Sequence, residues 1–251
     1  MIAALPMYDR PGTMAANDRF WALIRDGLRA RAIAAPDRLS RDDTPLYDLW
    51  LSPDLVLSQT CGLPYRADLH GRVTLVGTPD YGVEGAPPGY YRSRIVVRAD
   101  DPRARLDDFE GVRLAHNSGG SQSGWAAIAN HWPGALRCVC LPTGAHVNSV
   151  AAVAEGRADL AAIDAVTWEL LLRAEPATAA LRVLESTAPT PGLPLIAAAG
   201  SDRAAIFDAV AGAIAALAPE DRTALCLRGL VRIPPEAYLA VPIPAQPAQN
   251  G

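Results

Sequence analysis

The chain has 251 residues, half of which are hydrophobic, and a formal net charge of −4 at pH 7. This length and composition are typical of a globular protein with one large core or two smaller ones. The net negative charge and the absence of arginine clusters give no electrostatic footprint for nucleic acid or for an anionic membrane, so neither is expected as a partner.

Residues 1–9 contain no charged segment followed by a long apolar stretch, and no run in the chain approaches the length of a membrane span. The sequence therefore predicts no signal peptide, no membrane insertion and a cytoplasmic location as encoded, or a periplasmic one if the natural N-terminus lies further upstream. The four cysteines lack the CxxC and histidine spacing of a zinc site. Cys138 and Cys140 share one face of a strand-like run, which predicts buried thiols. We expect no disulfide framework, no metal and no cofactor.

Apolar runs, together with apolar residues at helical spacing, predict strands and helices that alternate along the chain. The predicted strands are 2–5, 55–57, 73–76, 90–98, 111–115, 136–141, 159–163 and 181–184. The predicted helices are 15–34, 125–130, 148–155, 164–174 and 202–217, with a short helical turn at 106–109 and a last helix that begins at 219. This alternation favours mainly parallel sheets, which bind ligands in loops at the carboxyl ends of their strands. The tail from residue 242, rich in Pro, Ala and Gln, is predicted to be disordered.

The stretch from 111 to 128 predicts a strand, a Gly/Ser loop and a helix, and the loop carries the most distinctive chemistry of the chain. Ser118, Ser121 and Ser123 bring three hydroxyl groups to the helix start, where backbone N–H groups lack intrahelical partners and the helix dipole is positive. This pattern predicts an anion site. The alternative is an ordinary N-cap beside a glycine turn, because the loop has neither the lysine of a Walker A motif nor the spacing of a dinucleotide fingerprint.

Polar and aromatic residues gather in five loops that follow predicted strands. Three loops lie in the middle of the chain, at 117–123, 143–146 and 164–167. Two lie in the N-terminal part, at 7–9 and 60–65. Loops at the carboxyl ends of strands could face one another across a cleft.

Four segments carry a family resemblance. The first two are Leu5-Pro-Met-Tyr8 and Gln59-Thr-Cys-Gly-Leu-Pro-Tyr65, and the third is Leu114-Ala-His-Asn-Ser-Gly-Gly-Ser-Gln-Ser-Gly124. The fourth spans residues 144–167, and shorter similarities lie at 91–98 and 190–194. In this order the segments resemble the phosphate/phosphite/phosphonate substrate-binding proteins of ABC transporters, the family that includes the phosphonate-binding component. The third segment is the most specific, because it is similar to the family's Asn…Ser-x-Ser-Gly loop.

The resemblance implies an α/β protein with the two-lobed type II periplasmic-binding-protein fold, in which two crossover strands join the lobes and an interlobe cleft closes on the ligand by a hinge motion. Lobe one would comprise residues 1–92 and 193–251, and lobe two residues 93–192. The implied function is non-catalytic binding of a small oxyanion, phosphate-like or phosphonate-like. The protein would serve an ABC permease as its partner or act as a stand-alone sensor.

The resemblance also implies a set of ligand-binding residues. Ser121, Gln122 and Ser123 would grip the tetrahedral oxyanion without a counter-charge. His146 could add a charge-assisted hydrogen bond when protonated, and Asp164 could accept a proton from the ligand or bind an ammonium group, although each could equally cap the helix that follows it. Tyr8 and Tyr65 would form the opposing wall. The full candidate set is Tyr8, Thr60, Tyr65, Asn117, Ser118, Ser121, Gln122, Ser123, His146 and Asp164.

The alternative function is that of a cytosolic enzyme on the same fold. Ser121 or Ser123, with His146 and Asp164, supplies the residue types of a nucleophilic triad. However, the Ser-x-Ser-Gly sequence lacks the Gly-x-Ser-x-Gly elbow of serine hydrolases. We therefore assign no catalytic residue from the sequence.

Overall fold

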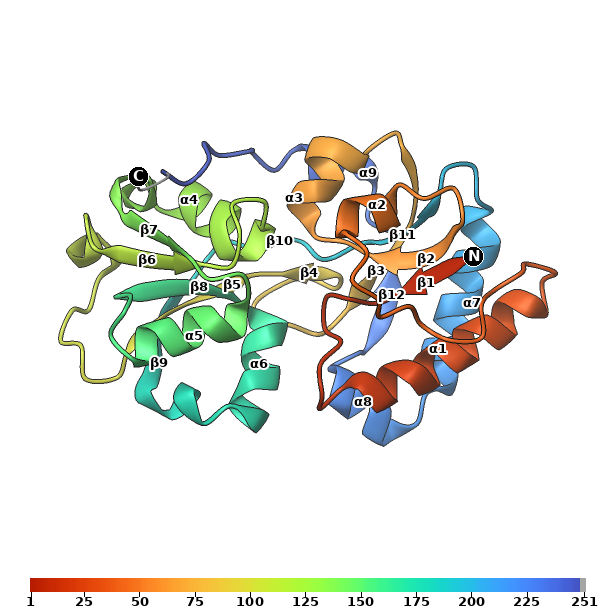
Figure 1. The fold of residues 1–251 in the computed structure, drawn as a ribbon, viewed down its shortest axis with the longest axis horizontal. Helices are drawn as coiled ribbons and strands as arrows, with labels where there is room; N and C mark the ends of the chain where they lie inside the picture. The colour runs from red at the N-terminus through yellow and green to blue at the C-terminus, as the bar shows by residue number, and fades with distance from the viewer. Residues whose placement is uncertain (249–251) are drawn as a thin grey trace. The chain divides into compact units, whose positions relative to one another are not determined.

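The computed structural model describes residues 1–248, which divide into two compact units. Unit 1 consists of Met1–Tyr90 and Pro191–Ala240, and unit 2 consists of Tyr91–Thr190 with the tail from Val241 on. The chain passes between the units at β4 (Tyr90–Tyr91) and β10 (Thr190–Pro191), two short strands that pair with each other (Figure 1). The sequence placed these passages at 92–93 and 192–193.

Unit 1 is built on a five-stranded sheet in the order β1-β2-β11-β3-β12. These strands are β1 (Ile2–Ala4), β2 (Leu55–Gln59), β11 (Leu195–Ala198), β3 (Val73–Asp80) and β12 (Gly229–Val231). Side chains alternate between the two faces, as strand geometry requires, so that Val76 on β3 enters one apolar core while its neighbour Leu75 enters another. Both faces of the sheet are therefore buried.

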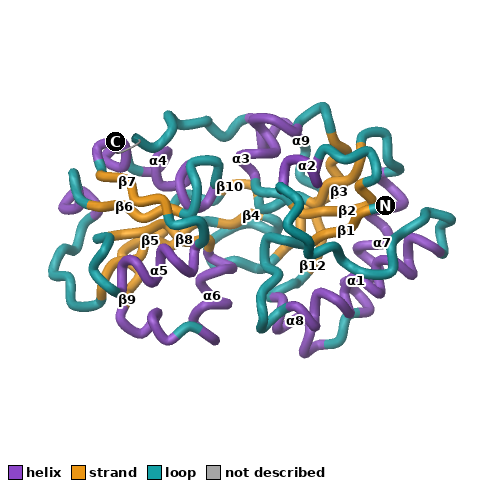
Figure 2. Tube along the Cα trace, viewed as in Figure 1, coloured by secondary structure: helices purple, strands orange, loops and turns teal. Residues whose placement is uncertain are grey.

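Helices cover both faces of the unit 1 sheet (Figure 2). On one face, α1 (Met14–Arg29) buries Phe20, Ile24 and Leu28 at helical spacing. The other helices of unit 1 are α2 (Leu46–Trp50), α3 (Gly62–Pro64), η1 (Tyr65–Leu69), α7 (Arg203–Ala216), α8 (Pro219–Leu225) and α9 (Pro235–Leu239). Of these, α7 packs with α1, whereas α2, η1 and α9 contribute to the core on the opposite face.

Unit 2 repeats this plan with the strand order β7-β6-β8-β5-β9. Its strands are β7 (Val139–Pro142), β6 (Arg113–His116), β8 (Leu160–Asp164), β5 (Ser93–Arg98) and β9 (Leu181–Ser186). Its helices are η2 (Leu106–Phe109), η3 (Gln122–Ala126), α4 (Ala127–His131), η4 (Pro133–Arg137), α5 (His146–Ala154), α6 (Ala165–Ala174) and η5 (Pro176–Ala180). On one face Trp125 and Ile128 cover the sheet, and on the other Val150 and Trp168 do so.

The predicted α/β class is confirmed, but the prediction of mainly parallel sheets is wrong. The strand that follows each passage between the units, β5 or β11, runs antiparallel to both of its neighbours. In the two five-stranded sheets, β1 pairs in parallel with β2, and β6 pairs in parallel with β7 and β8. Within the described residues, no helix has both the length and the apolar character needed to cross a bilayer.

The predicted disorder of the tail is wrong for residues 242–248, and these residues belong to unit 2 instead of the predicted lobe one. The indole N–H of Trp125 donates a hydrogen bond to the Ala245 carbonyl at 2.9 Å, and the Asn130 side-chain amide donates one to the Pro242 carbonyl at 2.9 Å. Both donors belong to unit 2, which explains the assignment. Residues 249–251, which the prediction also covered, lie outside the described residues.

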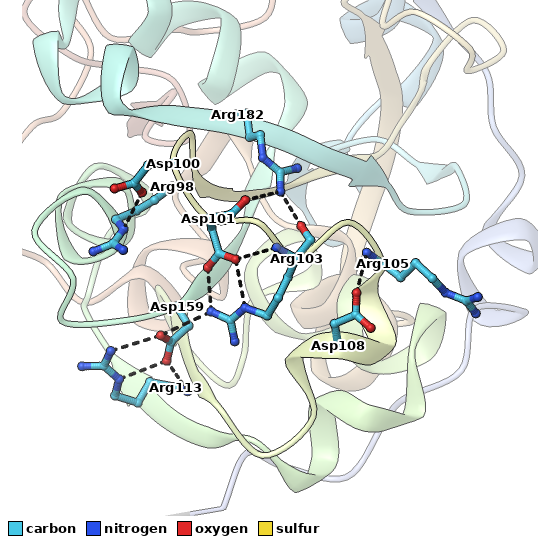
Figure 3. Close-up of polar contacts among 9 residues, drawn as sticks. All are labelled: Arg98, Asp100, Asp101, Arg103, Arg105, Asp108, Arg113, Asp159 and Arg182. Carbon is cyan, nitrogen blue, oxygen red and sulfur yellow. Dashed lines mark hydrogen bonds and ion pairs between the residues drawn. The ribbon is translucent and has the colours of Figure 1, made fainter.

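Ion pairs lie at the end of the unit 2 sheet where β6, β8 and β9 begin and β5 ends (Figure 3). Arg113, at the start of β6, donates two side-chain hydrogen bonds to Asp159, at 3.0 and 3.1 Å. Arg103 donates two to Asp101, at 3.0 and 2.6 Å, and Arg182 on β9 donates to the Asp101 carbonyl at 3.0 Å. The network therefore links the segment after β5 to β9, and it joins β6 to the residue that precedes β8.

Asp101→Asn should lower the free energy of unfolding by about 1 kcal/mol at neutral pH, because Arg103 loses its charged partner. The hydrogen bonds from Arg103 lower the pKa of Asp101 to about 2 in the folded protein, whereas an unfolded aspartate titrates near about 4. The stabilisation is thus fully present above pH ~4 and is lost as the pH falls toward ~2. Urea unfolding of the wild type and Asp101→Asn should show the difference in their unfolding free energies shrinking as the pH falls over that range.

If the unfolding free energies of the wild type and Asp101→Asn differed by the same amount at all pH values, the ion pair would not be the cause of the difference. Asp100→Asn is the matched control, because Asp100 is the neighbouring residue and its carboxylate is exposed. Its stability should differ little from that of the wild type.

Candidate functional site

The Gly/Ser loop leads from the end of β6 at His116 into the π-helical turn η3, and Ser121 is the N-cap residue. Ser121 has an extended backbone, and its Oγ accepts a hydrogen bond from the Gly124 N–H at 3.0 Å. The first backbone bonds of the turn are donated by Trp125 and Ala126, both to the Ser121 carbonyl. The N–H groups of Gln122 and Ser123 precede these bonds, so they lie where a helix start binds an anion.

Asn117 fixes the conformation of this loop through contacts with two glycines, Gly124 and Gly144. A Cβ atom on Gly124 would lie 1.8 Å from Asn117 Oδ1, so only glycine lets the Asn117 side chain pack against the first turn. The Asn117 carbonyl accepts a hydrogen bond from the Gly144 N–H at 3.0 Å, which ties the loop to the connection between β7 and α5. Ser118 has a local role, because its Oγ accepts a hydrogen bond from the Gly120 N–H at 3.0 Å.

Ser123 joins three segments of unit 2. Its Oγ lies 2.9 Å from His146 Nε2, and its carbonyl accepts a hydrogen bond from the Ser93 hydroxyl at 2.8 Å. A neutral His146 with an unprotonated Nε2 accepts a hydrogen bond from the Ser123 hydroxyl, whereas a protonated ring donates one to Ser123 Oγ. His146 is the first residue of α5, where Ala145 is the N-cap and has no side-chain cap. The alternative prediction that His146 caps this helix is therefore wrong.

Asp164 lies at the end of β8, the central strand of the sheet, and is 2% exposed. Its Oδ1 accepts a hydrogen bond from the Thr167 N–H at 2.8 Å and so caps α6, as the alternative prediction had it. Its neighbour across the β5–β8 ladder is Ser93. Ser93 was missed by the sequence analysis, although it lies inside the similarity at 91–98, because only the folded structure shows its contact with Ser123.

The loop holds no permanent positive charge. Within residues 116–124, all of which the structure describes, the only ionisable side chain is that of His116. Burial lowers the pKa of His116 below its usual value, although a hydrogen bond with the backbone of Ser118 partly opposes this, so the ring is neutral at pH 7. The loop therefore offers an anion N–H and O–H donors only.

The three candidate residues of unit 1 lie in different environments. Tyr8 lines a small pocket together with Gln59 and Tyr81, and its ring meets that of Tyr81 edge-on at 5.0 Å. Thr60 is fully buried, and its N–H donates to the Pro194 carbonyl at 3.0 Å. Tyr65 lies in the core, with its ring centroid 5.0 Å from that of Tyr238, and burial raises the pKa of Tyr65 to about 12.

The pocket lining includes Tyr8 but neither Thr60 nor Tyr65. In unit 2, hydrogen bonds and packing bring Asn117, Ser121, Ser123 and His146 together around the loop. Their roles as ligand contacts, and those of the remaining candidates, stay predictions. Among the residues that the structure describes, no three His, Cys, Asp or Glu side chains come together as metal ligands.

A family model described as the periplasmic substrate-binding protein of phosphonate ABC transporters matches residues 57–233, more than half of the chain. No curated protein matches the chain. Several solved structures share its fold. PhnD1 from Prochlorococcus marinus in complex with methylphosphonate has a TM-score of 0.69 at 16% sequence identity, over 94% of this chain and 93% of that one.

Two further structures are similar. XAC2383 from Xanthomonas citri bound to ATP has a TM-score of 0.68 at 15% identity, over 94% of this chain and 91% of that one. A binding protein component of an ABC phosphonate transporter from Pseudomonas aeruginosa has a TM-score of 0.63 at 13% identity, over 92% and 80% of the respective chains. At these identities the likeness establishes the two-lobed type II fold, which confirms the predicted architecture.

Ser121→Ala should lower the free energy of unfolding by about 1 kcal/mol, because the buried Gly124 N–H loses its acceptor. Ser121→Asn should restore most of the loss, since asparagine caps helices as well as serine does. Urea unfolding of the three proteins measures both effects. If alanine and asparagine proved equally destabilising, the hydrogen bond to Gly124 would not be what stabilises this turn.

Proposed function

Because the chain belongs to the family of periplasmic substrate-binding proteins of phosphonate ABC transporters, we propose that it binds a small phosphorus oxyanion, of phosphonate or phosphate type, at the helix start formed by residues 121–124. The observation that carries the proposal is the hydrogen bonding of Ser121. Its Oγ accepts from the Gly124 N–H, and a hydroxyl that accepts one hydrogen bond can still donate its own hydrogen to a ligand oxygen beside the first turn.

The chemistry of the loop favours a ligand that is recognised by hydrogen bonds. N–H and O–H donors at a helix start stabilise P–O⁻ groups without a cation, and charge-assisted bonds of this kind are shorter and stronger than neutral ones. Ser123 and His146 lie within hydrogen-bond distance of each other, so the direction of their hydrogen bond follows the protonation state of the histidine ring, which a ligand's charge can influence. Two proteins of the same fold hold phosphorus oxyanions, methylphosphonate in one and ATP in the other, which supports this ligand class.

Family membership also supports an ABC permease as the partner and a periplasmic location. In this role the protein binds and releases its ligand unchanged. The family model describes a substrate-binding protein. Asp164, the candidate acid of a triad, accepts a hydrogen bond from the Thr167 N–H and so caps α6. These observations favour transport over the predicted alternative of a cytosolic enzyme.

One observation favours that second function. The 2.9 Å contact between Ser123 Oγ and His146 Nε2 has the distance of the nucleophile–base pair in a serine hydrolase. Against it, Ser123 lies inside a helical turn with its carbonyl held by Ser93, not on an exposed elbow. Hydrolysis of activated esters that disappears in Ser123→Ala would favour the enzyme, and no hydrolysis above buffer is expected.

Purified protein should be stabilised by methylphosphonate, 2-aminoethylphosphonate, phosphite or phosphate in a thermal-shift screen, with sulfate and neutral metabolites as controls. A ligand at a hundred times its dissociation constant stabilises the native state by about 2.7 kcal/mol, a shift of several degrees. Isothermal titration calorimetry then measures the dissociation constant. A response to neutral metabolites with silence toward every oxyanion would overturn the proposal.

Ser121→Asp should fold with near wild-type stability and lose oxyanion binding by about a hundredfold or more. Aspartate caps a helix start as well as serine does and suits its dipole, but it places a negative charge where the proposed ligand's oxygens lie. Ser121→Asn is the matched neutral control and should bind far better than the aspartate variant. Equal affinity of the aspartate and asparagine variants, measured by calorimetry, would move the site away from this helix start.

A further inference from the structure

The C-terminal tail, residues 241–248, lies on unit 2 beside the proposed anion loop. It follows α9 of unit 1, and Figure 1 shows it running past α4. Its sequence is rich in proline, so it forms no internal ladder of hydrogen bonds and its carbonyls are left to accept from other groups. Two of them do so, at Pro242 and Ala245, from the side chains of Asn130 and Trp125. Further along, the backbone of Ala248 hydrogen-bonds to the side chain of Cys140 on β7.

The tail also contacts the anion loop itself, at Gly119. A Cβ atom on Gly119 would lie 2.6 Å from Gln246 Oε1 and 3.0 Å from Pro247 Cδ. Gly119 does not have a positive φ, so its backbone conformation does not call for glycine. Its neighbour Gly120 has only Ser118 Oγ near its Cβ position, at 3.5 Å. The close approach of the tail is therefore a specific reason for glycine at 119 and not at 120.

We propose that residues 241–248 act as a strap that positions the anion loop for its ligand. The strap covers the loop at Gly119 and is fixed at Trp125, which is the fourth residue after the Ser121 cap and packs in the core of unit 2. Gln246 and Pro247 thus act as positioning residues, through the loop backbone. The effect on ligand affinity rests on the proposed function, whereas the ordering of the loop does not.

The strap is mostly exposed, so it can detach without unfolding unit 2. Ile243 is 56% exposed, and hydrogen bonds to the Pro242 and Ala245 carbonyls and packing at Gly119 hold the strap on unit 2. Segments with little buried surface open locally at a small fraction of the global free energy. Opening would free the loop residues that precede the helix, and binding would then have to order them again, which lowers affinity.

Hydrogen exchange of the ligand-free protein tests the ordering directly. A chain ending at Ala240 and the variant Gly119→Ala should both exchange the amides of residues 117–124 faster, by about tenfold in the truncated chain. A chain ending at Ala248 and Gly120→Ala are the matched controls and should exchange as the full chain does. Trp125→Phe keeps an aromatic ring but loses the N–H donor, so it should accelerate exchange of these amides in part. It provides the test if the truncated chain fails to fold.

Calorimetry with methylphosphonate and phosphate on the same proteins measures the consequence for binding. The dissociation constant should rise about tenfold in the chain ending at Ala240, while its melting temperature without ligand stays close to that of the control. The strap proposal would be wrong if truncation at Ala240 left the amide exchange of the loop unchanged, or if it made exchange faster without changing the dissociation constant. If the full chain binds no oxyanion while exchange still responds to the truncation, the proposed function fails and the ordering of the loop by the tail stands.

Discussion

The hydrogen bond from the Gly124 N–H to Ser121 Oγ determines where the chain turns from β6 into a helix, and the geometry of the loop follows from it. With the helix start fixed, Gly124 lies against the Asn117 side chain, and Ser123 reaches both Ser93 and His146. A single small side chain thus satisfies one backbone donor of the first turn.

Unit 2 places its Arg–Asp pairs and its serine-rich loop at opposite ends of the same strands. The Arg–Asp pairs lie at the amino ends of β6 and β8, where Arg113 holds Asp159 and Arg103 holds Asp101. The carboxyl ends of the same strands carry the serine-rich loop and Asp164, and His116 there is kept neutral by burial. The ions at this end of the sheet are paired, because Arg113 and Arg103 each have a carboxylate within hydrogen-bond distance.

Much of this site could be predicted from local sequence, because its signals are local. A short apolar run, a Ser-x-Ser step and an alanine-rich run predict a strand, a cap and a helix, and the structure has these in order. Distant partners could not be predicted in this way. Tyr65 packs in a core with Tyr238, and Ser93 reaches Ser123 only because β5 runs antiparallel beside β8, a direction that alternating strands and helices did not indicate.

The tail shows why composition alone gave the wrong prediction for residues 242–248. Proline-rich chains are disordered when nothing outside them satisfies their carbonyls or repays the loss of conformational entropy. Here Trp125 and Asn130 supply the donors, and Gly119 leaves the room for Gln246 and Pro247. The complementary surface is encoded far away in the sequence, in the same loop that carries the serines. Order in the tail and order in the loop are therefore properties of one contact, and a change in either segment acts on both.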